Sequence, residues 1–258
     1  MKSAILVVSF GTTHLDTLSK NIGMVEEELR HTFPELRFYR AFTSKTVRSR
    51  LKQRYDLSVD SVEEALERIK ADGAARVFVQ PTLLIPGEEY DRLRSTILGN
   101  AGPLEIILGQ PLLWDDTDLN AVIEILRQTY PVDRDTILLA MGHGTEHEAG
   151  CLYVRLAQTM REQDSSMFLC TVEGKPDFEE TVRQLKEQKK RKVHLVPLLL
   201  VAGDHSKNDM VGEGTDSLRR QLEREGFEVS WALQGLGELP AIRERYVRRA
   251  KGVCEGLI

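Results

Sequence analysis

The sequence lacks the features of a disulfide-bonded, membrane-spanning or nucleic-acid-binding protein. Only three cysteines occur in 258 residues, and none forms a C-x-x-C pair, so a disulfide framework and a thiolate zinc site are excluded. No stretch approaches the roughly 18 apolar residues of a membrane span, and we expect no membrane partner. The 35 Lys+Arg and 40 Asp+Glu give a net charge of −5, and aromatic residues make up only 6%. A nucleic-acid partner is therefore not expected.

What remains is the composition of a globular chain that buries a core, with 41% hydrophobic and 29% charged residues. The apolar run Ala4–Val8 breaks at Ser9, and no small-residue cleavage site follows it. This run indicates a first buried strand and not a signal peptide. Together with the few cysteines, it leads us to expect a cytoplasmic protein.

Short apolar runs rich in β-branched residues alternate with helical patterns along the chain. A capping box at Ser61 and Glu64 precedes apolar residues at helical spacing, and Asp177 with Glu180 caps a second helix. The residues Leu15, Leu18, Ile22, Val25 and Leu29 share one helical face. This alternation predicts a parallel α/β architecture with strands at Ala4–Val8, Leu36–Tyr39, Arg76–Val79, Leu104–Leu108, Thr136–Met141, Met167–Val172, Val193–Val196 and Glu228–Ala232.

The two halves of the chain also repeat each other. Ile5–Thr12 matches Leu138–Thr145, and Val77–Glu89 matches Val193–His205 in the same order. We therefore predict an α/β fold of two similar Rossmann-like domains, each with a four-stranded parallel sheet flanked by helices. The expected boundaries are 1–131 and 132–258, with a cleft between the domains.

Candidate ligating residues follow the strands of the second half. In open parallel sheets, ligands bind beyond the carboxyl ends of the strands. His143 follows Thr136–Met141 and is flanked by two glycines that would let the chain turn tightly there, Glu173 ends the next strand, and His205 follows Val193–Val196. Two imidazoles and a carboxylate suit a divalent first-row metal, and Glu89 holds the position of His205 in the first half.

Other histidines have simpler interpretations. His194 lies within an apolar strand and is expected to be a core or interface residue, and His31 is expected at the surface. His14 and His147 each follow a Gly-Thr turn, where a structural role is favoured over an auxiliary proton carrier. The Gly142-x-Gly144 pattern lacks the third glycine of a dinucleotide-binding loop, because the sixth position is His147.

Positive charge gathers between Arg40 and Arg54, where no acidic residue interrupts the run. A solvated helix face is the ordinary explanation of such a cluster. In an acidic chain it also suits an anionic small molecule, because arginine pairs with carboxylates in two-point geometry. The cluster comprises Arg40, Lys45, Arg48, Arg50, Lys52 and Arg54.

Motifs along nearly the whole chain closely resemble the anaerobic cobalt chelatases of the CbiK type, which are class II chelatases related to ferrochelatase. These motifs are Val7–Thr12, Arg40–Ser44, Gly87–Tyr90, Met141–Gly144, Val172–Glu173, Leu200–Met210 and Gly235–Glu238. The resemblance implies the chelatase-like fold and a lyase that inserts Co²⁺ into sirohydrochlorin, a tetrapyrrole, in the oxygen-independent route to cobalamin. Co²⁺ would be a substrate metal, and no organic cofactor is expected.

The resemblance also implies roles for residues. His143, Glu173 and His205 would bind the metal, His143, His205 and Glu89 would be catalytic, and Glu89 would face the macrocycle. We expect a histidine, His143 first, to accept a pyrrole proton, because imidazole has an unperturbed pKa of about 6.5. Further substrate contacts are assigned to Phe10, Arg48, Arg50 and Arg54.

Three alternatives stay open at this point. The first is a chelatase for another metal, such as Fe²⁺ for sirohaem, since a His/His/Glu site discriminates poorly among Co²⁺, Ni²⁺ and Fe²⁺. The second is a carrier that binds a tetrapyrrole or metal without turnover. The third is a generic two-domain binding protein for sugars or amino acids, which gives no reason for histidines at repeated strand ends. The sequence also leaves open whether the chain forms a homo-oligomer.

Overall fold

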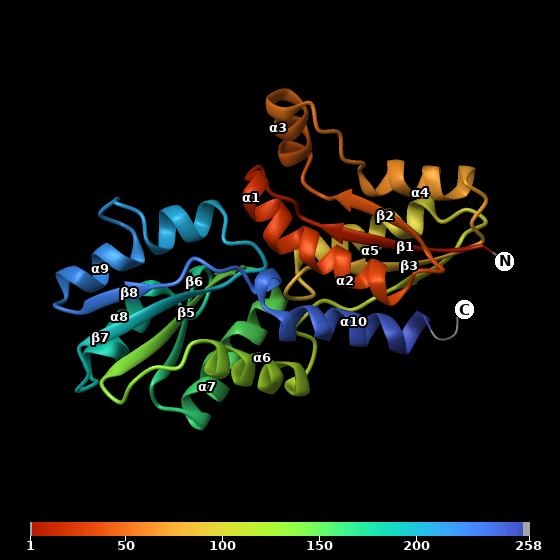
Figure 1. The fold of residues 1–258 in the computed structure, drawn as a ribbon. Helices are drawn as coiled ribbons and strands as arrows, with labels where there is room; N and C mark the ends of the chain where they lie inside the picture. The colour runs from red at the N-terminus through yellow and green to blue at the C-terminus, as the bar shows by residue number, and fades with distance from the viewer. Residues whose placement is uncertain (1, 255–258) are drawn as a thin grey trace. The chain divides into compact units, whose positions relative to one another are not determined.

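The structure is a computed structural model that describes residues 2–254, and all eight expected strands are present (Figure 1). The strands are β1 (Ser3–Ser9), β2 (Arg37–Phe42), β3 (Arg76–Pro81), β4 (Glu105–Leu108), β5 (Thr136–Gly144), β6 (Met167–Glu173), β7 (Lys192–Leu198) and β8 (Glu228–Trp231). The α-helices are α1 (Leu15–Thr17), α2 (Met24–Thr32), α3 (Lys45–Tyr55), α4 (Val62–Ala71), α5 (Glu88–Asn100), α6 (Asp116–Thr129), α7 (Cys151–Gln163), α8 (Phe178–Lys186), α9 (Leu218–Arg224) and α10 (Pro240–Cys254).

The strands form two parallel sheets with the same topology. One sheet has the order β2-β1-β3-β4 and the other has the order β6-β5-β7-β8, so each strand of the first has a counterpart in the second. The expected fold class is confirmed. The matched segments of the sequence are also equivalent in structure. Strand β1 lies between β2 and β3 in the first sheet, and β5 lies between β6 and β7 in the second.

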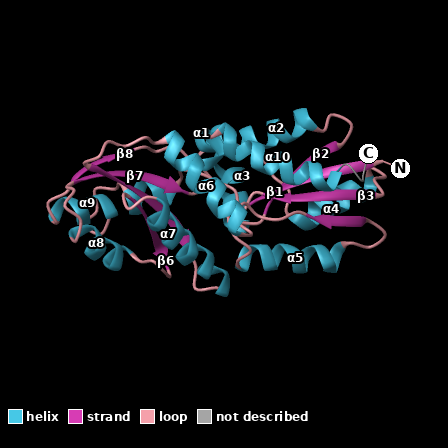
Figure 2. Cartoon of the chain, turned by 90° about the horizontal axis from the view of Figure 1, so that it is seen from below, coloured by secondary structure: helices cyan, strands magenta, loops and turns pink. Residues whose placement is uncertain are grey.

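The first sheet is covered on both faces by helices, as Figure 2 shows. Alternate residues of β1 and β3 pack with the apolar sides of α4 and α5 in one core. The other face meets α10, which contacts β3 and lies alongside α2 (Figure 1). Burial on both faces explains why these strands read as continuous apolar runs in the sequence.

The second sheet is built in the same way. Alternate residues of β5, Ile137, Leu139 and Met141, share a core with the apolar residues of α8 and α9. The residues between them, Leu138 and Ala140, are buried on the opposite face, where α7 contacts β6. Both faces are therefore closed, and the polar side chains that follow the strands lie at the sheet's carboxyl edge.

The compact units of the chain differ from the expected boundaries in two places. Unit 1 comprises residues 1–112 and 237–258, and unit 2 comprises residues 113–236. Helix α6 belongs to unit 2, where it packs on α7 and Asn120 accepts a 2.5 Å hydrogen bond from Gln163. Helix α10 returns to unit 1, where the Tyr246 hydroxyl donates to the Thr82 carbonyl at 3.3 Å. The repeat could not reveal these assignments, because it does not specify which sheet a flanking helix covers.

Most of the expected local structure is also present. Ser61 and Glu64 form the predicted capping box of α4, and Asp177 accepts a 2.8 Å hydrogen bond from the Glu180 amide at the start of α8. The helical face predicted from Leu15 to Leu29 is interrupted by a π-helical turn, η1 (Leu18–Gly23), and Leu15 is exposed. Within residues 2–254, no helix is long and apolar enough to cross a bilayer.

His194 lies on β7, where it is only partly buried. Its Nδ1 is 2.9 Å from the Ser230 hydroxyl, and its ring is 6.1 Å from that of Tyr130. Desolvation lowers the pKa of His194 below the usual 6.5. Between the lowered pKa and that value the unfolded chain binds more protons than the folded one, so stability falls as the pH falls through this window.

We therefore expect unit 2 of the wild type to lose more stability between pH 7.5 and pH 5.5 than unit 2 of a His194→Gln variant. Both tryptophans of the chain, Trp114 and Trp231, lie in unit 2, so urea unfolding followed by tryptophan fluorescence reports on this unit. Equal pH dependence in the two proteins would contradict the prediction.

Candidate functional site

His143 lies on β5 near its carboxyl end, two residues beyond the strand end predicted from the sequence. Strand β5 continues to Gly144, and Gly142 and Gly144 pair with Thr171 and Glu173 of β6. The expectation of a tight turn at Gly142 is therefore wrong. This glycine serves a close contact instead, because a Cβ there would lie 2.8 Å from the Tyr153 ring.

Glu173 ends β6, as expected, and its carbonyl oxygen lies close against Gly144, its partner on β5. Gly144 has a φ of +77°, and a Cβ at this position would lie 1.7 Å from the Glu173 carbonyl oxygen. Only glycine allows β5 and β6 to approach this closely. The contact brings the Glu173 Oε2 to 4.0 Å from the His143 Nδ1.

His205 directly precedes a different element, the short π-helical turn η3 (Ser206–Met210) that follows β7. Ser206 and Met210 are buried, and they hold the inner side of this turn against the core of unit 2. His205 precedes Ser206, and Asp209 precedes Met210. The side chains of His205 and Asp209 are both about two-fifths exposed. The His205 Nδ1 is 2.6 Å from the Asp209 Oδ2.

The two histidines meet at the carboxyl edge of the second sheet. Their ring centroids are 4.5 Å apart, and the rings are nearly perpendicular at 87°. The His143 Nδ1 is 3.1 Å from the Gly144 carbonyl oxygen, which can only accept a hydrogen bond, as can the Asp209 carboxylate beside His205. When each ring is neutral, these acceptors favour the proton on Nδ1, which leaves the lone pair on Nε2.

The structure brings the three expected ligands into one neighbourhood without forming a closed coordination sphere. Among the described residues, no group of three or more His, Cys, Asp or Glu side chains is assembled to hold a metal ion. The rings of His143 and His205 contact each other directly, whereas Glu173 lies at ion-pair distance from His143.

A buried tyrosine packs against the carboxyl end of β5. The Tyr153 side chain on α7 lies against Gly142, and burial raises its pKa to about 12. The phenol is therefore neutral throughout the physiological range. Tyr153 therefore places an uncharged side chain against Gly142, next to His143 in the sequence.

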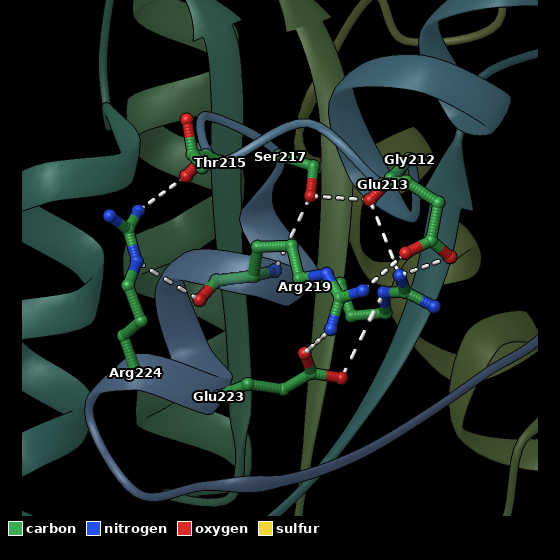
Figure 3. Close-up of polar contacts among 8 residues, drawn as sticks. Gly212, Glu213, Thr215, Ser217, Arg219, Glu223 and Arg224 are labelled. Carbon is green, nitrogen blue, oxygen red and sulfur yellow. Dashed lines mark hydrogen bonds and ion pairs between the residues drawn. The ribbon is translucent and has the colours of Figure 1, made fainter.

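The segment that follows η3 is fastened to α9 by a network of charged groups (Figure 3). Glu213 pairs with Arg219 at 2.6 Å and also with Arg220, and the Ser217 hydroxyl donates a 2.7 Å hydrogen bond to the Gly212 carbonyl. Arg219 is nearly buried and also lies 5.1 Å from the Trp231 ring centroid. These contacts hold the residues that directly follow η3 against the start of α9.

In unit 1, Glu89 and Phe10 lie at the corresponding edge of the first sheet. Glu89 is in the first turn of α5, after β3, and its Oε1 is 2.9 Å from the Arg92 guanidinium. Phe10 directly follows β1 and is 49% exposed. The Phe10 carbonyl accepts a 3.3 Å hydrogen bond from the Ser44 amide, which joins this loop to the start of α3.

The basic cluster divides between two elements. Arg40 lies on β2 and forms a two-point ion pair with the buried Glu26, with its Nε 2.7 Å from Oε1, so its charge is already neutralised. The others lie on α3, where Arg48 pairs with Glu64 at 3.5 Å and Lys52 with Asp56 at 2.5 Å. Within residues 2–254, the remaining three form no ion pair: Lys45, Arg50 and Arg54.

His147 and His31 make local contacts of their own. His147 accepts a 3.1 Å hydrogen bond from the Ala149 amide and caps a short 3₁₀ turn. His31 is on the surface of α2, with its Nδ1 3.4 Å from Glu27 Oε1. These geometries agree with the structural interpretations of both residues.

Sequence reasoning missed Asp209 as a partner of His205. Asp209 occurs in the Leu200–Met210 motif, but no role was assigned to it. The spacing of four residues was the available signal, because residues four apart in a helical turn share a face. The sequence did not reveal that His205 opens such a turn, since the stretch after β7 is rich in loop residues.

Comparison with solved structures defines the fold class. SirB from Bacillus subtilis with Fe³⁺ superposes with a TM-score of 0.69 at 17% identity, covering 99% of this chain and 98% of that one. SirB from Bacillus subtilis subspecies spizizenii, a sirohydrochlorin chelatase in complex with cobalt, gives a TM-score of 0.59 at 16% identity and covers 99% and 97% of the two chains. The architecture is that of the chelatases.

Sequence comparison then identifies the family. The model of the cobalt chelatase (CbiK) family matches residues 3–255, and the chain belongs to this family. It is 37% identical to the sirohydrochlorin cobaltochelatase of Salmonella typhimurium over 96% of this chain and 94% of that protein. It is 31% identical to the sirohydrochlorin cobaltochelatase CbiKC of Nitratidesulfovibrio vulgaris over 92% of this chain and 85% of that protein. The suspected resemblance is confirmed.

Proposed function

We propose that this chain is a chelatase that inserts Co²⁺ into sirohydrochlorin, with release of two pyrrole protons. The observation that carries the proposal is the pair of perpendicular imidazoles, His143 and His205, at the carboxyl edge of a sheet in a chain of the cobalt chelatase family. Two relatives that share 37% and 31% of their residues with this chain are named for this reaction. No organic cofactor is needed, because the reaction is an exchange of ligands and protons without electron transfer.

The histidine pair would hold the incoming cation through Nε2, with Glu173 as a third, carboxylate ligand. Nδ1 of each ring is occupied by a hydrogen-bond acceptor, so the lone pairs of both Nε2 atoms are available. Nitrogen and oxygen ligands suit Co²⁺, which gives no preference over Fe²⁺ or Ni²⁺ by affinity alone. As the cation passes to the ring nitrogens, a vacated imidazole accepts a pyrrole proton, and His143 is our first candidate.

Residues of unit 1 would contact the macrocycle. The exposed Phe10 ring offers an apolar surface to a flat ring system, and Glu89 is proposed to orient the macrocycle or take the second proton. Helix α3 presents Arg48, Arg50 and Arg54 to the carboxylates of sirohydrochlorin. Guanidinium groups suit this task because they keep their charge and bind carboxylates in two-point geometry.

Reversing two charges on α3 tests the substrate contacts. We expect Arg50→Glu with Arg54→Glu to raise KM for sirohydrochlorin by about 5–30-fold, since two such exposed contacts amount to ~1–2 kcal/mol. The dependence on Co²⁺ should not change, and the effect should shrink at high ionic strength. The matched control is Arg134→Glu with Lys189→Glu, two exposed residues that precede β5 and β7 and give the same change in net charge. Equal KM values in the two double variants would contradict the assignment.

The proposed reaction is tested by anaerobic absorbance of the macrocycle, with Co²⁺, Fe²⁺ or Ni²⁺ supplied in turn and a reaction without protein as control. Multiple turnovers with Co²⁺ preferred are the expected result. Turnover that favours Fe²⁺ would move the assignment to sirohaem synthesis. Binding of the macrocycle without acceleration of metal insertion would leave a carrier.

We further propose a cytoplasmic location. The cysteines whose side chains the structure describes, Cys151 and Cys170, are both free thiols, as a reducing compartment allows. Fractionation of cells followed by immunodetection tests this proposal, and recovery of the protein outside the cytoplasm would overturn it.

A further inference from the structure

We infer that Asp209 is a positioning residue, which sets the tautomer and the orientation of the His205 ring so that Nε2 faces the incoming cation. The inference rests on the proposed function, because it gives a metal-binding purpose to this ring. It adds a residue to which neither the motif nor the family match assigned a role.

The geometry of the pair is that of a strong, oriented hydrogen bond. The His205 Nδ1 and the Asp209 Oδ2 are 2.6 Å apart, and an ionised carboxylate can only accept the bond. The proton of neutral His205 is therefore held on Nδ1. Free neutral histidine favours the opposite tautomer, with the proton on Nε2, in which the outward nitrogen has no lone pair for a metal.

The local backbone explains why the two side chains meet. The Val211 amide donates to the Ser206 carbonyl at 3.3 Å, which is the wide spacing of a π-helical turn, and such turns are frequent at functional sites. Gly212 allows the turn to close, since a Cβ there would lie 2.3 Å from the Asn208 carbonyl oxygen. With Ser206 and Met210 buried on the inner side, His205 and Asp209 are left together on the outer side.

The two histidines of the pair are fixed by different means. His143 is held by the carbonyl of its own neighbour, Gly144, on a strand of the sheet. His205 lies on a short turn outside the sheet, and Asp209 is the acceptor that fixes its ring. Carboxylate partners of metal-binding histidines typically contribute 10–100-fold to metal affinity or activity, and this magnitude is about what we expect here.

The first test reads the tautomer without metal or activity. In ¹⁵N-labelled apoprotein at one fixed pH at which histidine is neutral, ¹H–¹⁵N correlation spectra should show His205 with an unprotonated Nε2. The Asp209→Ala variant should shift His205 toward the Nε2–H tautomer. In the Asp209→Asn variant the amide oxygen can accept the same bond, so this variant should retain the wild-type tautomer in a larger fraction of molecules. An unchanged His205 signal in Asp209→Ala would overturn the inference.

The second test measures the consequence for the cation. Titration calorimetry should show a Kd for Co²⁺ raised about 10–100-fold in Asp209→Ala and less in Asp209→Asn. In turnover, KM for Co²⁺ should rise while KM for sirohydrochlorin stays constant. Near-ultraviolet circular dichroism shows whether each variant is folded. If Asp209→Ala is misfolded, the Kd of Asp209→Asn for Co²⁺ provides the test. Wild-type affinity for Co²⁺ in both folded variants would refute the inference.

Glu27→Ala is the matched control. It removes a carboxylate from beside a histidine at the same spacing of four residues, His31 on the surface of α2. The His205 tautomer and Co²⁺ affinity should be unchanged in this variant. If the wild type binds Co²⁺ through His205 but inserts none, the proposed reaction fails and the inference stands. If the wild type inserts Co²⁺ and Asp209→Ala does so with unchanged constants, only the inference fails.

Discussion

Replacing either His143 or His205 with alanine is expected to lower the rate of cobalt insertion by about 10²–10⁴-fold, the usual contribution of a positioned proton-transfer group. Both rings are about two-fifths exposed at the end of a sheet, so neither contributes to the core. The variants should therefore unfold at urea concentrations close to that of the wild type. Anaerobic absorbance of the macrocycle with saturating Co²⁺ measures the rate.

A histidine replacement elsewhere in the chain is the control for the loss of cobalt insertion. His31→Ala removes an exposed ring on α2 and should keep the wild-type rate. The double variant His143→Ala with His205→Ala should be hardly slower than either single variant, because residues that act as a unit are not additive. Cobalt insertion at an unchanged rate in both single variants would refute the assignment of the histidine pair.

Gly144→Ala is expected to be the most damaging small substitution in unit 2. An alanine at a φ of +77° costs about 1–3 kcal/mol in backbone conformation. The overlap of its Cβ with the Glu173 carbonyl, 1.7 Å away without adjustment, adds about 1–3 kcal/mol as β5 and β6 separate. Urea unfolding followed by tryptophan fluorescence measures the loss, and cobalt insertion should fall as His143 and Glu173 move.

Gly226→Ala isolates the contribution of the overlap. Gly226 also lies in unit 2 and has a φ of +83°, but a Cβ there would meet nothing within 4 Å. This variant should lose only the backbone contribution of about 1–3 kcal/mol and should retain its activity. Equal losses in the two variants would show that the approach of β6 to Gly144 does not constrain the site.

Much of the fold could be predicted because its elements depend on local patterns. Strands buried on both faces are continuous apolar runs, and the helix caps at Ser61 and Asp177 use side chains three residues from their partners. The internal repeat added the shared strand order of the two sheets. Helix α10 escaped prediction because its burial against unit 1 depends on contacts such as Tyr246 with Thr82, 164 residues apart.

The candidate site divides in the same way. By itself, the sequence determined the residue types, the strand ends that carry His143 and Glu173, and the family motifs. Only the tertiary structure decided that the Glu173 carbonyl lies close against Gly144, that the two imidazoles are perpendicular at 4.5 Å, and that Asp209 is the hydrogen-bond partner of His205. The reason is physical: periodicity reports which face of an element is buried, whereas a hydrogen bond or a ring contact depends on where the backbones of separate elements come together.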